Sequence, residues 1–208
     1  MVRLSSPQVK RVIIVHGWSG KPEHGWYPWL KKELVSKGFE VIVPQLPDEN
    51  YPRIEKWVPA LSRIIDKPDE NTYLIGHSLG CQTICRYLEG LPNGIQIGGA
   101  IFVAGFFKHL NDSDYDSDDK ETESHWLNRP IDFAKIRSHI NKSVAIFSED
   151  DPDIPLDNNE DFETELGSKV IILNGYKHFT GDAGITELPI VLEKLLEIVY
   201  PERRRRAK

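Results

Sequence analysis

Six short apolar runs, separated by segments with helical periodicity, are the feature that most restricts the fold of this chain. The runs are rich in valine and isoleucine and occupy residues 11–17, 39–45, 72–78, 99–105, 143–149 and 169–173. Most are continuously apolar rather than alternating, which is typical of strands covered on both faces. This alternation predicts an α/β fold, with a mainly parallel sheet of about six strands and helices on both faces.

The clearest helical patterns cover residues 25–38, 51–65, 80–91 and 186–199. Pro59 lies inside the second of these segments and is expected to kink or split its helix. Ligands of parallel sheets bind beyond the carboxyl ends of the strands. Functional residues are therefore expected just after the apolar runs.

Composition and charge limit the class of protein. The chain has 208 residues, of which 39% are hydrophobic, enough for one domain with a full core. A net charge of −6 disfavours a nucleic-acid partner. No stretch approaches the roughly 18 apolar residues of a membrane helix, and the first residues lack an apolar signal core. The two cysteines, Cys81 and Cys85, are expected to be reduced core thiols, so we expect a cytoplasmic protein without membrane contact.

The pattern Gly-x-Ser-x-Gly at residues 76–80 follows the third apolar run and precedes a helical pattern. A serine in that context is typical of a nucleophile elbow, a strained turn that projects the hydroxyl from the sheet. The helix that follows directs its N-terminal amides toward the site, which favours developing negative charge. We predict that Ser78 is a nucleophile; the alternative is a structural Gly/Ser turn.

A serine nucleophile needs a base, and the base needs a group that orients it. His178 follows the last apolar run and precedes the last helix, where a base can reach the elbow, and we predict it as the base. The other downstream histidines, His109, His125 and His139, lie in a polar segment or in an expected helix.

The orienting acid should follow the apolar run at residues 143–149. Three aspartates compete there, Asp150, Asp151 and Asp153. We favour Asp151, because Pro152 holds it in an extended conformation; Asp150 is the next choice.

An oxyanion hole requires two backbone N–H donors. We expect them from Leu79, directly after the nucleophile, and from Trp18, in the loop after the first run, where Gly17 lets the backbone approach the site. His16 and His77, beside these glycines, are expected to hold loops rather than act as bases. Gly17, Trp18 and Trp26 are expected to contact substrate, although tryptophans at the spacing of Trp18, Trp26 and Trp29 also suit helix packing.

An acidic segment interrupts the strand–helix alternation at about residues 106–130, with seven carboxylates against two lysines between 108 and 126. It follows a strand, so we expect a flexible loop or small cap that overhangs the site. Its spacing partly fits an EF-hand, but Ser117 stands where that loop needs glycine. We expect no metal and no cofactor. The domain is expected to span 1–198, with a solvated basic tail at 199–208.

The segments "HGWYPWLKKEL" (24–34), "LPD" (46–48), "GHSLG" (76–80), "SEDDPDIP" (148–155) and "HF" (178–179) together resemble the retinoblastoma-binding protein 9-like family of small serine hydrolases, on the α/β-hydrolase fold. The resemblance implies a catalytic triad of Ser78, Asp151 and His178. Lys177 departs from it, because relatives usually have glycine there. The Leu-x-Cys-x-Glu peptide behind the family name is missing, so a retinoblastoma-type protein partner is not indicated.

The expected function is hydrolysis of a small acyl compound, most simply an ester, by a carboxylesterase-like serine hydrolase that forms an acyl-enzyme. The alternative is a non-catalytic or weakly catalytic protein-binding module on a hydrolase fold, because fold alone does not establish activity.

Overall fold

The computed structural model describes residues 9–111 and 115–201. Its centre is a six-stranded sheet with the order β2-β1-β3-β4-β5-β6, in which each neighbouring pair of strands is parallel. The strands are β1 (Arg11–Val15), β2 (Glu40–Ile42), β3 (Thr72–His77), β4 (Gly99–Val103), β5 (Ser143–Ser148) and β6 (Lys169–Leu173). Each predicted apolar run contains one strand, which confirms the predicted fold class.

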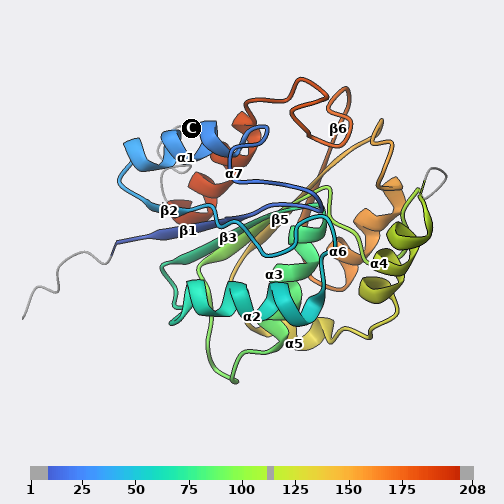
Figure 1. The fold of residues 1–208 in the computed structure, drawn as a ribbon. Helices are drawn as coiled ribbons and strands as arrows, with labels where there is room; N and C mark the ends of the chain where they lie inside the picture. Colours follow the sequence, from blue (N-terminus) through green and yellow to red (C-terminus); the bar gives the residue numbers. More distant parts are fainter. Residues whose placement is uncertain (1–8, 112–114, 202–208) are drawn as a thin grey trace, which may run out of the picture.

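Helices cover both faces of the sheet (Figure 1). The helices α1 and α7 lie on one face, and α2, α3 and α5 lie on the other. The bounds are α1 (Tyr27–Ser36), α2 (Ile54–Ile65), α3 (Leu79–Glu89), α4 (Ser117–Leu127), α5 (Phe133–Ser138), α6 (Asn159–Thr164) and α7 (Pro189–Val199), with a short 3-10 helix, η1, at Leu156–Asn158. Strands β3 and β4 are buried along their whole length, as their continuous apolar character requires.

Helix α2 runs through Pro59 without being split, so that part of the prediction is wrong. Proline removes one backbone hydrogen bond, but the same helix buries Trp57, Leu61 and Ile65 against the core. The apolar face therefore keeps the two halves of the segment in one helix.

The carboxyl ends of the strands meet at one edge of the sheet. The register pairs Val15 of β1 with Gly76 of β3, and Ser148 of β5 with Leu173 of β6. The segments that follow β1, β3, β5 and β6 therefore gather at this edge, where parallel sheets place their ligand sites.

The acidic insert contains a helix, α4, rather than only a loop. Asp116 caps it, because its carboxylate accepts the backbone N–H groups of Asp118 and Asp119. Trp126, near its C-terminal end, is fully buried, and its carbonyl accepts a hydrogen bond from Arg86 of α3 at 2.6 Å. The insert is thus fixed to the helix that follows Ser78. Residues 112–114, which carry two of the EF-hand positions, and most of the basic tail, 202–208, lie outside the described residues.

Over residues 9–111 and 115–201, no helix has both the length and the apolar character that crossing a bilayer requires.

Candidate active site

Ser78 occupies the tight turn between β3 and α3. It is the N-cap of α3 with φ 51° and ψ −123°, a backbone conformation that costs a non-glycine residue free energy. A Cβ on Gly80 would lie 2.3 Å from the carbonyl oxygen of Val15, and one on Gly76 would lie 2.8 Å from the amide nitrogen of Cys81. Only glycine fits at both positions, so the strained turn has the geometry of a nucleophile elbow.

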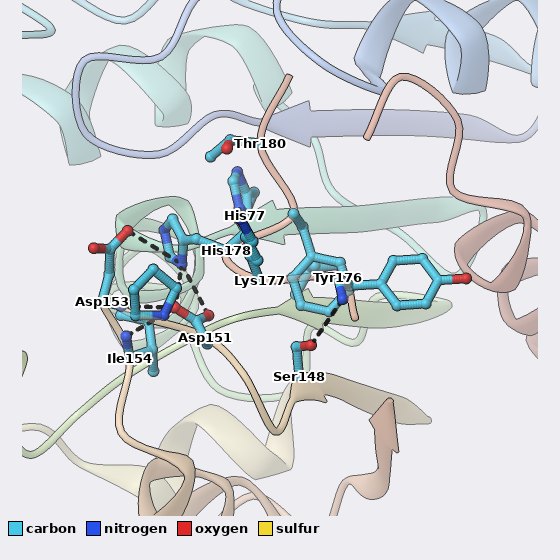
Figure 2. Close-up of polar contacts among 12 residues, drawn as sticks. His77, Ser148, Asp151, Asp153, Ile154, Tyr176, Lys177, His178 and Thr180 are labelled. Atoms are coloured by element: carbon cyan, nitrogen blue, oxygen red, sulfur yellow. Dashed lines mark hydrogen bonds and ion pairs between the residues drawn. The ribbon is translucent and has the colours of Figure 1, made fainter. Parts of the chain in front are cut away.

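Asp151 and His178 form a hydrogen-bonded pair (Figure 2). Because a carboxylate only accepts, Nδ1–H of His178 is the donor, at 2.9 Å from Oδ2 and 3.1 Å from Oδ1. Oδ1 of Asp151 also accepts the backbone N–H groups of Asp153 and Ile154, which holds the carboxylate in place. The side chains are 3% and 12% exposed, so water competes little with the pair. Asp153 is half exposed, and its nearer oxygen lies 3.9 Å from the same nitrogen.

Asp150 has a different role from Asp151. Its Oδ1 accepts hydrogen bonds from the hydroxyl of Ser148 at 2.6 Å and from the backbone N–H groups of Gly175 and Lys177. The bond from Ser148 is the main cause that lowers the pKa of this carboxyl below its usual value. Asp150 therefore ties the loop that carries His178 to the end of β5, while Asp151 contacts the imidazole itself.

The loop around His178 is strained on both sides of the histidine. Lys177 has φ 47° and Phe179 has φ 55°, the left-handed region that favours glycine. Such residues persist where surrounding contacts over-determine the backbone. One such contact is the indole N–H of Trp26, which donates to the carbonyl of Phe179 at 3.1 Å.

The loop after β1 passes directly beside Ser78. A Cβ on Gly17 would lie 2.9 Å from Cβ of Ser78, so the absence of a side chain permits this approach. Trp18 follows, with its indole N–H donated to the carbonyl of Asn50 at 3.0 Å. Leu79 is the first residue of α3, and the first N–H groups of a helix have no partner within it. Both predicted oxyanion donors thus belong to segments that border Ser78.

His16 and His77 both hold backbone segments. Nδ1–H of His16 donates to the carbonyl of Gly17, and its Nε2 accepts the backbone N–H of Leu46. Burial lowers the pKa of His16, which keeps the ring in the neutral form that this pair of bonds requires. Nε2 of His77 lies 2.8 Å from the carbonyl oxygen of His178.

Two cavities open at Ser78 and His178, which line both of them. The larger has a volume of about 420 Å³, and its lining includes Gly17, Trp18 and Trp26. The three residues that we expected to contact substrate therefore all border this cavity. Trp26 does so while its side chain is fully buried and packed in the core.

The smaller cavity, of about 340 Å³, extends from the same centre toward the insert. Its lining shares Trp18 with the larger cavity and adds a set of mostly apolar side chains, Leu79, Phe106, Leu110, Tyr115 and Ile154. Except for Leu79, these residues were not predicted from the sequence. The available signal was their position: Phe106 follows β4, and Ile154 follows β5.

The remaining histidines considered as bases line neither of these cavities. His125 packs at the start of α2, where Nε2 lies 3.0 Å from a carboxylate oxygen of Glu55. His139 is buried, and its Nδ1–H donates to the carbonyl of Ile95. His109 is exposed beside Asp157.

One group in the described part of the chain brings together three residues of the kinds that bind metals: Asp151, Asp153 and His178, whose ligand atoms lie within 4.8 Å of one another. Nδ1 of His178 is already engaged with Asp151. The geometry is that of a hydrogen-bonded acid–base pair.

Comparison with known proteins agrees with this architecture. A family model described as "Serine hydrolase" matches residues 12–197. YdeN from Bacillus subtilis (strain 168) is 34% identical over 195 residues, which cover 94% of this chain and 99% of YdeN. The crystal structure of the ydeN gene product superposes with a TM-score of 0.85 at 32% identity, covering 92% of this chain and 99% of that one.

Two further proteins extend the similarity. Serine hydrolase RBBP9 from Rattus norvegicus is 27% identical over 177 residues, covering 85% of this chain and 89% of RBBP9. The esterase RhEst1 from Rhodococcus sp. ECU1013 shares the fold, with a TM-score of 0.64 at 15% identity, covering 92% of this chain and 91% of RhEst1. With its family model matched over almost the whole domain, the chain belongs to the serine hydrolase family.

Proposed function

We propose that this protein hydrolyses carboxylic esters through a triad of Ser78, His178 and Asp151. The observation that carries the proposal is the Asp151–His178 hydrogen bond, because His178 lines the same two cavities as Ser78. A buried carboxylate on Nδ1 leaves Nε2 of the imidazole available to take a proton.

In the proposed reaction, Oγ of Ser78 attacks the ester carbonyl while Nε2 of His178 takes the hydroxyl proton. The N–H groups of Leu79 and Trp18 stabilise the tetrahedral oxyanion. His178 then donates the proton to the leaving alcohol oxygen, and an acyl-enzyme remains. Water, deprotonated by His178, attacks the acyl carbon, and the returning proton restores the serine hydroxyl.

Asp151 orients His178 and stabilises the imidazolium that forms in each half of the reaction. Its two oxygens face the imidazole, and one of them also accepts two backbone N–H groups. Those bonds fix the orientation of the carboxylate, so it keeps facing Nδ1 of the imidazole throughout the reaction.

A small or medium ester is the substrate class that the site supports best. Both cavities are lined by Ser78 and His178, so one can take the acyl group and the other the alcohol. RhEst1, an esterase, shares the fold of this chain at a level of identity that supports the architecture alone.

Labelling with a fluorophosphonate probe tests the proposal. The wild type is expected to be labelled and Ser78→Ala is not, while p-nitrophenyl acetate and butyrate are turned over by the wild type only. Matched thioesters and amides, assayed in parallel, establish whether esters are preferred. A folded wild type that neither labels nor turns over any of these substrates contradicts the proposal and favours a protein-binding module.

A further inference from the structure

His77 connects the nucleophile strand to the loop that carries His178. It is the last residue of β3, directly before Ser78, and it is 5% exposed. Its Nδ1 lies 2.7 Å from the hydroxyl oxygen of Tyr27, at the start of α1, and its Nε2 lies 2.8 Å from the carbonyl oxygen of His178. Figure 2 shows His77 beside His178 at the strand end.

The partners of His77 determine which ring nitrogen carries its proton. A backbone carbonyl only accepts hydrogen bonds, so Nε2 of His77 must carry the proton that it donates to His178. In the neutral ring Nδ1 is then an acceptor, and the hydroxyl of Tyr27 donates to it. Burial raises the pKa of Tyr27, so its hydroxyl keeps the proton that this bond requires.

The surroundings of His77 favour this neutral form. The aromatic rings of Trp26 and Tyr27 pack against the imidazole at 6.0 Å between centroids, and the ring of His178 lies at 5.0 Å. Burial, and next the proximity of His178, lower the pKa of His77 to about 3. The ring is therefore a fixed donor and acceptor over the working range of a hydrolase rather than a second base.

The loop that receives this hydrogen bond is the strained one. Positive φ values at Lys177 and Phe179 flank His178, so its position depends on contacts from outside the loop. From one side Asp150 holds the N–H of Lys177. From the other, His77 and Trp26 hold the carbonyls of the next two residues, His178 and Phe179.

We propose that Tyr27 and His77 are positioning residues, which set the distance between the His178 imidazole and Ser78. They act through two hydrogen bonds in series, from the hydroxyl of Tyr27 to His77 and from His77 to the carbonyl of His178. This inference rests on the proposed triad. Because His77 is covalently next to Ser78, the bond from His77 to the His178 backbone ties nucleophile and base to the same strand end. Placement errors of about 1 Å in such a pair cost roughly 100-fold in rate.

Three substitutions separate positioning from simple packing. His77→Leu removes the donor, His77→Gln replaces the imidazole with an amide N–H that can reach the same carbonyl, and Tyr27→Phe removes only the hydroxyl that fixes the tautomer. Tyr87→Phe is the matched control, because Tyr87 is equally buried in α3 and its hydroxyl has no hydrogen-bond partner within the described residues.

The expected kinetic result, measured with a p-nitrophenyl ester on folded protein, is a loss in kcat with little change in KM. His77→Leu should lower kcat by about 10- to 100-fold, Tyr27→Phe by about 3- to 10-fold, and His77→Gln should recover most of the loss. Tyr87→Phe should stay within about twofold of the wild type. Equal kcat values for His77→Leu and wild type, or equal losses in Tyr27→Phe and Tyr87→Phe, would overturn the proposal.

A crystal structure of His77→Leu gives a readout that does not depend on turnover. We expect the His178 imidazole to be displaced from its position against Asp151, with the sheet unchanged. An imidazole in the same position as in the wild type would contradict the positioning role, whatever the substrate. A displaced imidazole in a protein whose Ser78 never reacts with the fluorophosphonate probe would instead remove the proposed function and leave the structural coupling intact.

Discussion

The backbone N–H of Lys177 donates to Oδ1 of Asp150 across 3.2 Å, and Lys177 adopts φ 47° to do so. The bond and the strained dihedral belong together, because the loop must turn sharply to direct the next residue, His178, toward Asp151. Glycine adopts this left-handed conformation without steric cost, whereas the Cβ of Lys177 opposes it.

Replacing Lys177 with glycine should therefore stabilise the protein. Relief of the left-handed strain outweighs the added freedom of the unfolded chain, and we expect the free energy of unfolding to rise by about 0.5–1 kcal/mol. Urea denaturation measures the change. Lys142→Gly is the control: Lys142 is exposed and does not have a positive φ, so the same substitution there should destabilise. A loss of stability in Lys177→Gly would contradict the strain argument.

Substituting Asp150, Asp151 and Asp153 one at a time should lower kcat in proportion to how closely each carboxylate contacts His178. Asp151→Asn keeps the shape but removes the charge, and we expect kcat to fall by roughly 10³- to 10⁴-fold. Asp150→Asn should cost less, because it weakens the loop rather than the imidazole contact. For Asp153→Asn we expect kcat to stay within about threefold of wild type. Asp153 is half exposed, and its nearer oxygen lies 3.9 Å from Nδ1 of His178. Steady-state kinetics on one ester decide the order; a larger loss for Asp150→Asn than for Asp151→Asn would reverse the assignment.

Stability should fall in mild acid because of His77. Its folded pKa is about 3, below the ordinary value of 6.5, so between these values the unfolded chain binds the extra proton. The contribution of His77 is complete above pH 6.5 and is lost as the pH falls toward 3. Burial shifts the pKa of His16 in the same direction.

The measurement is the free energy of unfolding from pH 8 to pH 4 for wild type and His77→Gln. The two curves should run parallel above pH 6.5 and converge below it, because glutamine does not titrate. Asp150 and Glu55, whose pKa values are lowered from 3.8 and 4.5, add their own losses at lower pH. Curves that remain parallel down to pH 4 would show that His77 is not held neutral.

The smaller cavity should control the size of the group that the enzyme accepts there. Leu110 is buried in the wall of this cavity of about 340 Å³, and the bulkier side chain of Leu110→Trp should narrow the cavity. We expect kcat/KM for p-nitrophenyl octanoate to fall about 10-fold relative to the acetate. Leu127→Trp, at the end of α4 and absent from the lining of both cavities, is the control. An unchanged ratio in Leu110→Trp would mean that the acyl chain lies in the other cavity.

Much of the fold and the placement of Ser78 and His178 follow from local patterns. Continuous apolar runs specify strands covered on both faces, and their carboxyl ends meet at one edge whatever the loops do. A serine between two glycines at such an end, and a histidine after the last run, are then brought to the same edge by topology alone.

The choice between Asp150 and Asp151 is harder to predict. Both follow β5, and only the turn at the strand end decides which side chain faces His178 and which faces the backbone of the neighbouring loop. The network of Tyr27, His77 and His178 is equally hidden from the sequence, because its members come from three distant segments. Helix α4 did leave a local signal, the pair Asp116 and Asp119 at capping-box spacing, which the acidic character of the segment obscured.

Arg86 braces the acidic insert against the helix that follows Ser78. Its guanidinium extends from α3 and donates to the carbonyls of Trp126 and Arg129. Displacing that end of α4 would leave a largely buried positive charge without these hydrogen bonds. The C-terminal end of α4 is therefore braced by α3, the helix that follows Ser78. Asp119, in the first turn of α4, lines the smaller cavity, so this side of the cavity is anchored before any ligand arrives.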